Sequence, residues 1–133
     1  MTKKEMVMAA IEANGYRPQI DNDGDVFVRF QMKTIYFMLS PDEEDQYVVV
    51  LLPQFADVDE GEEALTLAVC NKEIRELRLA KVYIDQTLKN VSASCEFFYT
   101  DSECLKVCVE HALNILGLVR ATFFRLKGEI SEC

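Results

Sequence analysis

The run QYVVVLL, residues 46–52, limits most strongly what this chain can fold into. Its apolar residues stand at both odd and even positions, so both faces of an extended strand would be apolar. A strand without polar alternation is typical of the middle of a sheet that is covered on both sides. The chain is therefore expected to contain a β-sheet with residues 46–52 at its centre.

Further strands are predicted on either side of this run. Residues 25–30 and 33–39 alternate apolar side chains between two faces, and only Gln31 and Met32 separate them. A short SPDEED link then leads into residues 46–52. Such short links favour antiparallel neighbours. Residues 81–85 and 91–99 form a second pair of strands, joined by a hairpin-sized link.

Three helices complete the pattern. Residues 3–14 carry an amphipathic stripe that ends at Asn14-Gly15. A second helix starts near Asp59, with Glu62 completing a capping box, and runs through residues 64–76. The last helix starts at a capping box of Thr100 and Glu103 and holds one apolar face as far as Phe123, with a frayed tail over 128–133.

The predicted order is helix, three strands, helix, two strands, helix. This order defines an α+β fold with a curved antiparallel sheet of about five strands and three helices. No repeat, linker or change of composition divides the chain, so residues 1–133 are expected to form one domain.

The charge of the chain is strongly negative and unevenly placed. The sequence has 23 acidic and 14 basic residues, which gives −9. Residues 42–45 and 57–63 contain nine acids and no base, so the remainder is neutral. This balance argues against nucleic-acid binding. The basic residues between Lys72 and Lys81 alternate with Glu73 and Glu76 and are typical of a mixed solvated surface.

No catalytic motif is present, so we expect neither an enzyme nor a cofactor. His111 is the one histidine, and it stands near Cys104 and Cys108 at helical spacing. These three residues support the alternative of a small metal-binding or thiol-dependent protein, although a structural zinc ion needs a fourth ligand. The acidic DNDGD segment at 21–25 lacks the glycine and glutamate of a calcium-binding loop and is interpreted as a turn.

Targeting signals are also missing from the pattern. The N-terminal segment has no long apolar core, and no stretch reaches the roughly 18 apolar residues of a membrane span. Five cysteines without CxxC spacing predict no disulfide framework. We therefore expect a cytoplasmic protein that contacts no membrane and keeps its thiols reduced.

Three sequence segments support a family resemblance: GYRPQIDNDGDVFVRF, VVVLLPQFADVDEGEE before a helix that contains Asn71, and KVYID before VSASCEFFY. On these residues the chain resembles the YbjN family of proposed bacterial sensory transduction regulators. The resemblance implies the fold of type III secretion chaperones, frequent dimerisation and no enzymatic activity. The function it implies is a non-catalytic protein-interaction module, either regulatory or chaperone-like, with an unidentified protein partner.

The second helix predicts a homodimer. At 100° per residue, Leu65 and Val69 point one way, while Leu67 and Ile74 point almost the opposite way. A helix that is apolar on opposite sides must be covered on both, and one sheet covers only one side. We therefore expect Leu67 and Ile74, or Leu65 and Val69, to cross the two-fold axis of a symmetric dimer.

Overall fold

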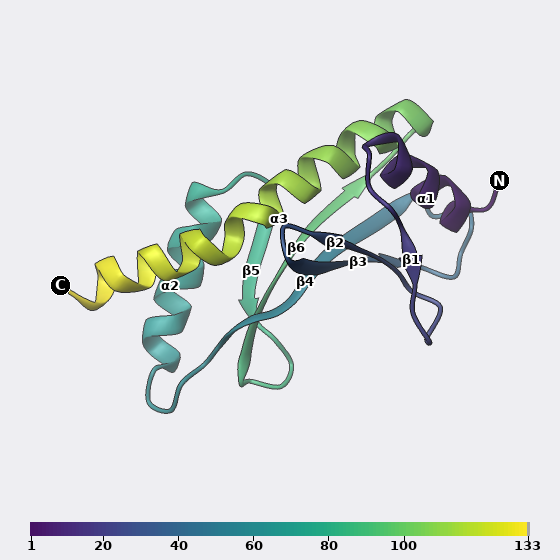
Figure 1. Ribbon diagram of the computed structural model, residues 1–133. Helices are drawn as coiled ribbons and strands as arrows, with labels where there is room; N and C mark the ends of the chain where they lie inside the picture. Colours follow the sequence, from purple (N-terminus) through teal and green to yellow (C-terminus); the bar gives the residue numbers. More distant parts are fainter. Residues whose placement is uncertain (133) are drawn as a thin grey trace.

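The computed structural model describes residues 1–132, which form three helices and six strands (Figure 1). In chain order these are α1 (Lys3–Ala13), β1 (Gln19–Ile20), β2 (Val26–Phe30), β3 (Lys33–Leu39), β4 (Tyr47–Asp57), α2 (Glu63–Glu76), β5 (Ala80–Ile84), β6 (Asn90–Phe98) and α3 (Ser102–Ser131). The α+β class and the order of the main elements are confirmed. The two-residue strand β1 is an addition that the sequence did not predict.

The strands make one antiparallel sheet in the order β1-β2-β3-β4-β6-β5. Strand β4 lies between β3 and β6, so the prediction that residues 46–52 occupy the middle of the sheet is confirmed. Strand β5 forms one edge and the short β1 forms the other.

The link between β2 and β3 is a two-residue hairpin. Gln31 and Met32 both adopt left-handed backbone angles, with φ of 49° and 66°. Two-residue hairpin loops favour this conformation because its twist matches the right-handed twist of the flanking strands. The tight hairpin places Phe30 and Lys33 directly opposite each other and fixes the register of the two strands.

Strand β4 continues five residues beyond the predicted end at Leu52. Its pairing with β6 shifts register between Leu52 and Ala56, and Gln54 in this interval has φ of 47°. The Gln54 backbone N–H donates to the Ser92 hydroxyl at 2.9 Å instead of to a ladder carbonyl. This bulge lets the strand pass Pro53, which has no N–H to donate.

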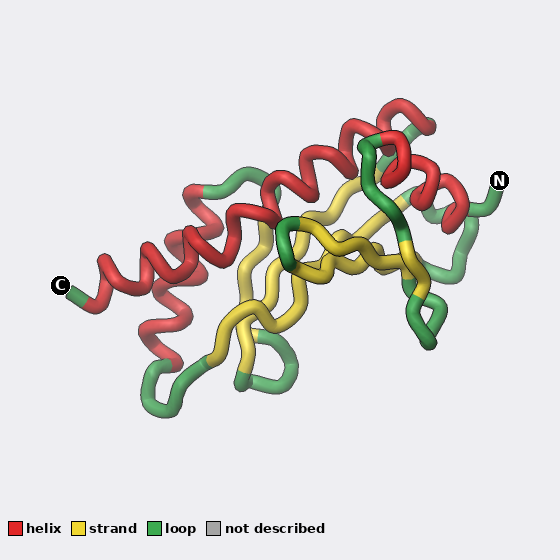
Figure 2. The backbone as a smooth tube through the Cα atoms, viewed as in Figure 1, coloured by secondary structure: helices red, strands yellow, loops and turns green. Residues whose placement is uncertain are grey.

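All three helices lie over the same face of the sheet (Figure 2). Helix α3 packs against β4 and β6, α1 against β3 and α3, and α2 against β5 and α3. The covered face carries the core, and one row of it runs straight across the strands: Val26, Phe37, Val50, Cys95 and Ala80. The sheet therefore has one covered and one open face.

The helix ends differ from those predicted. Helix α1 starts with a complete capping box of Thr2 and Glu5. The predicted Asp59 cap of α2 is wrong: the helix begins after Glu62, without a side-chain cap. The predicted Thr100 cap of α3 is also wrong, because Asp101 accepts the Cys104 backbone N–H at 2.8 Å.

The frayed tail predicted over 128–133 is wrong as far as Ser131, because α3 is helical to that residue; Cys133 lies outside the described residues. Ion pairs hold this long C-terminal part beside α2. Arg125 meets Glu76 at 3.0 Å, and Lys127 meets Glu62 at 3.2 Å. The acidic segment after β4 is thereby partly neutralised by α3.

Candidate protein-interaction surfaces

The structure separates the four residues that were predicted for a dimer interface. Val69 is fully buried, and Leu65 is partly buried and packs against the core. Leu67 and Ile74 remain 56% and 45% exposed. Of the two alternative pairs, Leu67 and Ile74 therefore form the available one, and we call this pair the α2 outer face.

The inner side of α2 contains a buried acid. Glu73 is fully buried, and neither of its carboxylate oxygens has a hydrogen-bond partner among residues 1–132. Burial, followed by the nearby charge of Glu76, raises the pKa of Glu73 to about 8, and Arg125 opposes the shift. Glu73 is therefore mostly uncharged at neutral pH, which is the form that an apolar site tolerates.

No helix within residues 1–132 lies over the second face of the sheet, and we call it the open face. Tyr36 stands opposite Leu51, and Met38 opposite Val49. Phe27 packs against Tyr36, with ring centroids 5.7 Å apart and the ring planes tilted by 40°. The aliphatic and aromatic side chains of this face range from half-buried to exposed: Phe27, Tyr36, Met38, Tyr47, Val49, Leu51, Tyr83 and the 73%-exposed Phe98. The expectation that residues 46–52 are covered on both sides is wrong for this face.

A cluster of polar side chains lies on the β5 side of the open face. The Glu96 carboxylate accepts hydrogen bonds from the Tyr47 and Ser94 hydroxyls and pairs with Lys81 at 2.7 Å. Burial works to raise the pKa of Glu96, but these partners outweigh it and hold the pKa below its usual value. The charges of this cluster are therefore paired within the chain. The apolar side chains beside it stay uncovered.

The alternative metal site is not assembled by the fold. The Cys104 and Cys108 sulfur atoms lie 3.9 Å apart on α3, and His111 is exposed on the next turn. Within residues 1–132, the one group of three such ligand atoms gathered within 4.8 Å is that of Asp21, Asp23 and Asp25. The two thiols and the imidazole thus do not meet as three ligands.

The acidic segment at 21–25 is the turn that was predicted. Asp21 Oδ1 accepts the backbone N–H groups of Asp23 and Asp25, each at 2.9 Å. The Gly24 φ of 84° completes the turn. The acids are close together because the turn folds them together.

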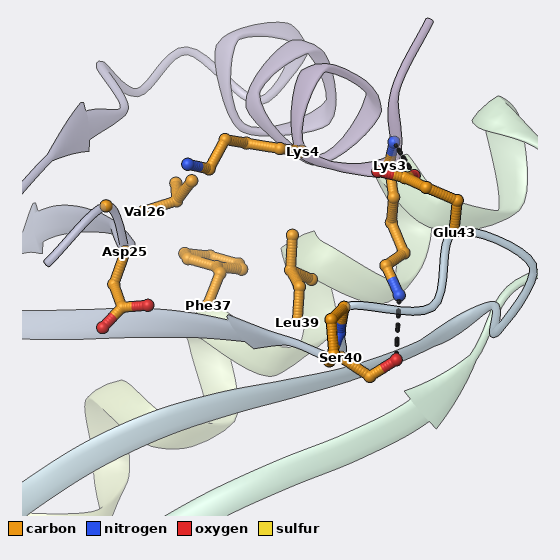
Figure 3. A pocket seen from close by; sticks show the side chains of 10 residues that line it. Lys3, Lys4, Asp25, Val26, Phe37, Leu39, Ser40 and Glu43 are labelled. Atoms are coloured by element: carbon orange, nitrogen blue, oxygen red, sulfur yellow. Dashed lines mark hydrogen bonds between the residues drawn. The ribbon is translucent and has the colours of Figure 1, made fainter.

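A small cavity of about 220 Å³ lies between the first turn of α1 and strands β2 and β3 (Figure 3). Lys3 is almost fully buried beside it and donates to the Asp42 and Asp45 carbonyls at 2.8 and 2.9 Å and to the Ser40 hydroxyl at 3.4 Å. Lys3 therefore ties α1 to the β3–β4 link. No sequence pattern marked this role, because an N-terminal lysine is usually solvated.

Helix α3 is long and apolar enough to cross a membrane by length and composition alone, with a mean hydropathy of 1.4 over 18 residues. The sequence did not indicate this, because polar residues interrupt the apolar residues of this helix. Core helices of soluble proteins pass the same test, and one face of α3 is built into the core.

The described geometry is that of a small α+β protein with a one-sided sheet and two uncovered apolar surfaces. The chain belongs to the YbjN family, whose model is described as "Putative bacterial sensory transduction regulator" and matches residues 3–102. Most of α3 follows the matched part. Among the curated proteins searched, none matches the chain.

Proposed function

We propose that this chain is a non-catalytic regulatory protein that acts by binding another protein on the open face. One observation carries the proposal: the central strand of the sheet presents Val49 and Leu51 on the open face, over which no helix lies in the described part of the chain. The regulatory description of the family is consistent with a role exerted through binding.

The charge of the open face supports a protein partner. Two bases, Arg29 and Lys81, and three acids, Asp57, Asp85 and Glu96, point to this face, so it carries −1 although the whole chain carries −9. A nearly neutral face rich in aromatic and aliphatic side chains has the composition of the core of a protein interface. It has no excess of basic residues for nucleic-acid phosphates.

A second copy of the chain is the proposed occupant of the α2 outer face. Leu67 and Ile74 lie one above the other, two turns apart, on the side of α2 opposite to Val69. In a two-fold dimer the same patch would meet itself, which suits a narrow apolar stripe. The open face belongs to other elements and stays free for the partner. We place both complexes in the cytoplasm.

The binding proposal can be tested with a photo-crosslinking amino acid at Met38, in cells that express the full chain. We expect a discrete crosslinked product that contains another protein and that is lost when Val49 is changed to Glu. The matched control carries the crosslinker at Glu110, which is exposed on α3 on the other side of the sheet. Equal products at both positions, or a product that contains only a second copy of this chain, would contradict the proposal.

A genetic measurement tests the regulatory part. In a strain that lacks the gene, the chain with Glu110→Gln should restore the normal transcript profile, whereas Val49→Glu should not. If the role is chaperone-like, Val49→Glu should instead lower the steady-state level of the crosslinked partner and leave the transcript profile unchanged. That result would replace regulation with client binding.

A further inference from the structure

The cysteines within residues 1–132 form two pairs of different accessibility. Cys70 and Cys95 are buried in the core, and burial raises the pKa of their thiols to about 11 and about 12. Cys104 and Cys108 are half-exposed at the start of α3. Thiolates react and buried thiols do not, so only the second of these pairs is chemically available.

The geometry of α3 brings the available pair together. Cys104 is the third residue of the helix and Cys108 lies one turn later, with the two sulfur atoms 3.9 Å apart. The separation is short because residues i and i+4 lie above one another on a helix. No other side chain is interposed between two sulfur atoms at this distance.

The two thiols differ in character. Hydrogen bonds from the Thr100 backbone and hydroxyl lower the pKa of the Cys104 thiol. Burial raises the pKa of the Cys108 thiol, and its neighbour Cys104 adds to the shift. Cys104 is therefore the better nucleophile, and Cys108 holds its proton until a partner sulfur becomes electrophilic.

We propose that Cys104 and Cys108 form a reversible intrahelical disulfide, with hydrogen peroxide as the oxidant. The Cys104 thiolate attacks one peroxide oxygen, the O–O bond breaks, and the leaving oxygen departs as water after protonation. The resulting Cys104 sulfenic acid is attacked by the Cys108 sulfur, which loses its proton. The sulfenic oxygen leaves as a second water, so two thiols and one peroxide give one disulfide.

The disulfide requires a local change of α3. A disulfide bond is about 2.05 Å long, with Cβ atoms about 3.8 Å apart, whereas Cβ atoms at i and i+4 lie about 5–6 Å apart. The first turn of α3 must therefore tighten or unwind. Its neighbour is α1, because the Asn14 side chain donates to the Lys106 carbonyl at 3.0 Å and to the Ala10 carbonyl at 2.9 Å. Oxidation is expected to loosen this link between α1 and α3.

The chain offers a direct readout because Lys106 lies between the two cysteines. Trypsin cleaves after Lys106, so a disulfide would link the peptides 90–106 and 107–120. We expect these two peptides to be recovered as one linked species after treatment of the folded chain with hydrogen peroxide, and to separate on reduction. Cys133→Ser is used throughout, because Cys133 would otherwise add a further thiol.

Variants identify the sulfur atoms. Cys104→Ser and Cys108→Ser should each abolish the link, and Cys95→Ala should retain it although Cys95 lies on peptide 90–106. If Cys95→Ala fails to fold, fragmentation of the linked species from the parent chain assigns the bridged cysteine instead. Absence of the link in the folded chain, or its persistence in Cys104→Ser, would overturn the proposal.

Hydrogen exchange tests the structural consequence. Oxidation of the parent chain should raise the exchange rate at the end of α1, near Ala10 to Asn14, by at least several-fold. The same peroxide treatment of Cys108→Ser should leave that rate unchanged. Equal exchange in the oxidised and reduced parent chain would show that the disulfide does not act on α1.

Discussion

Tyr36 on β3 stands directly opposite Leu51 on β4, on the open face of the sheet. One residue earlier on β4, Val50 stands opposite Phe37 and is fully buried beneath the helices. Adjacent residues of one strand therefore point into opposite environments, although both are apolar. The central strand is apolar on two faces, and the chain itself covers one of them.

Strand β4 allows a matched test of this one-sided cover. Val49 and Val50 are identical residues in the same strand, and they differ in the face to which they point. Val50→Ala should lower the free energy of unfolding by about 2–3 kcal/mol, because it removes two buried methyl groups and leaves a cavity.

Val49→Ala makes the same chemical change on the open face, and we expect it to cost less than about 1.5 kcal/mol. The intrinsic strand propensities cancel in the comparison. Chemical denaturation of both variants measures the difference. Equal losses would mean that the open face is covered in the folded protein.

The sequence predicted the sheet well because strand patterning is a local property. Residues 33–39 alternate, 46–52 do not, and the links between them are too short for any arrangement other than antiparallel neighbours. What covers the second face could not be predicted. Apolar residues at both odd and even positions of a strand show only that both of its faces avoid water. They do not show whether the same chain or another protein provides the cover.

The helix ends show a second limit. Thr100 and Asp101 are adjacent candidates for the same cap, and the choice of Asp101 depends on the exact path of the chain out of β6. The burial of Glu73 could not be foreseen either, since a glutamate among charged residues of a helix usually faces solvent. For the dimer, helical geometry predicted that Leu67 and Ile74 point away from Val69, and burial in the fold distinguishes the two pairs.

The α2 outer face should be required for self-association. We expect the unmodified chain to sediment as a dimer at high micromolar concentration, and the double variant Leu67→Glu, Ile74→Glu to sediment as a soluble monomer of 15.2 kDa. Because both side chains are exposed, the free energy of unfolding of the monomeric variant should lie within about 1 kcal/mol of that of the unmodified chain diluted until it is monomeric. Val69→Glu is the contrasting variant and should prevent folding, since it buries a charge in the core. An unmodified chain that is monomeric under these conditions would contradict the dimer.

Gly117 is required by a close approach between α3 and the β2–β3 hairpin. A Cβ atom at this position would lie 2.8 Å from the ring of Phe30 and 2.8 Å from the side chain of Gln31. Alanine should favour a helix by about 1 kcal/mol over glycine, but displacing a buried ring costs about 1–3 kcal/mol. We therefore expect Gly117→Ala to lower the melting temperature.

Gly128 is the matched control in the same helix, because a Cβ atom there would meet no atom of the described residues within 4 Å. Gly128→Ala should stabilise the chain by up to about 1 kcal/mol. Differential scanning calorimetry of the two variants measures opposite shifts. A stabilising Gly117→Ala would mean that the hairpin does not rest on α3.

The buried Glu73 should make the stability of the chain fall as pH rises. Burial raises the pKa of Glu73 from 4.5 to about 8 in the folded state, and the unfolded state is expected to keep the lower value. Between these values the folded chain binds more protons than the unfolded chain, so the free energy of unfolding decreases with pH. At 1.36 kcal/mol per pKa unit, the loss amounts to about 3–5 kcal/mol between pH 4.5 and pH 8 and levels off above pH 8.

Glu73→Gln removes the titrating group, so it should leave stability at pH 5 nearly unchanged, remove most of this slope and stabilise the chain at pH 8.5. Glu110→Gln, on the exposed side of α3, is the control and should follow the parent chain. Urea denaturation from pH 5 to pH 8.5 measures all three slopes, and parallel curves for the parent chain and Glu73→Gln would show that Glu73 is ionised in the folded protein at neutral pH.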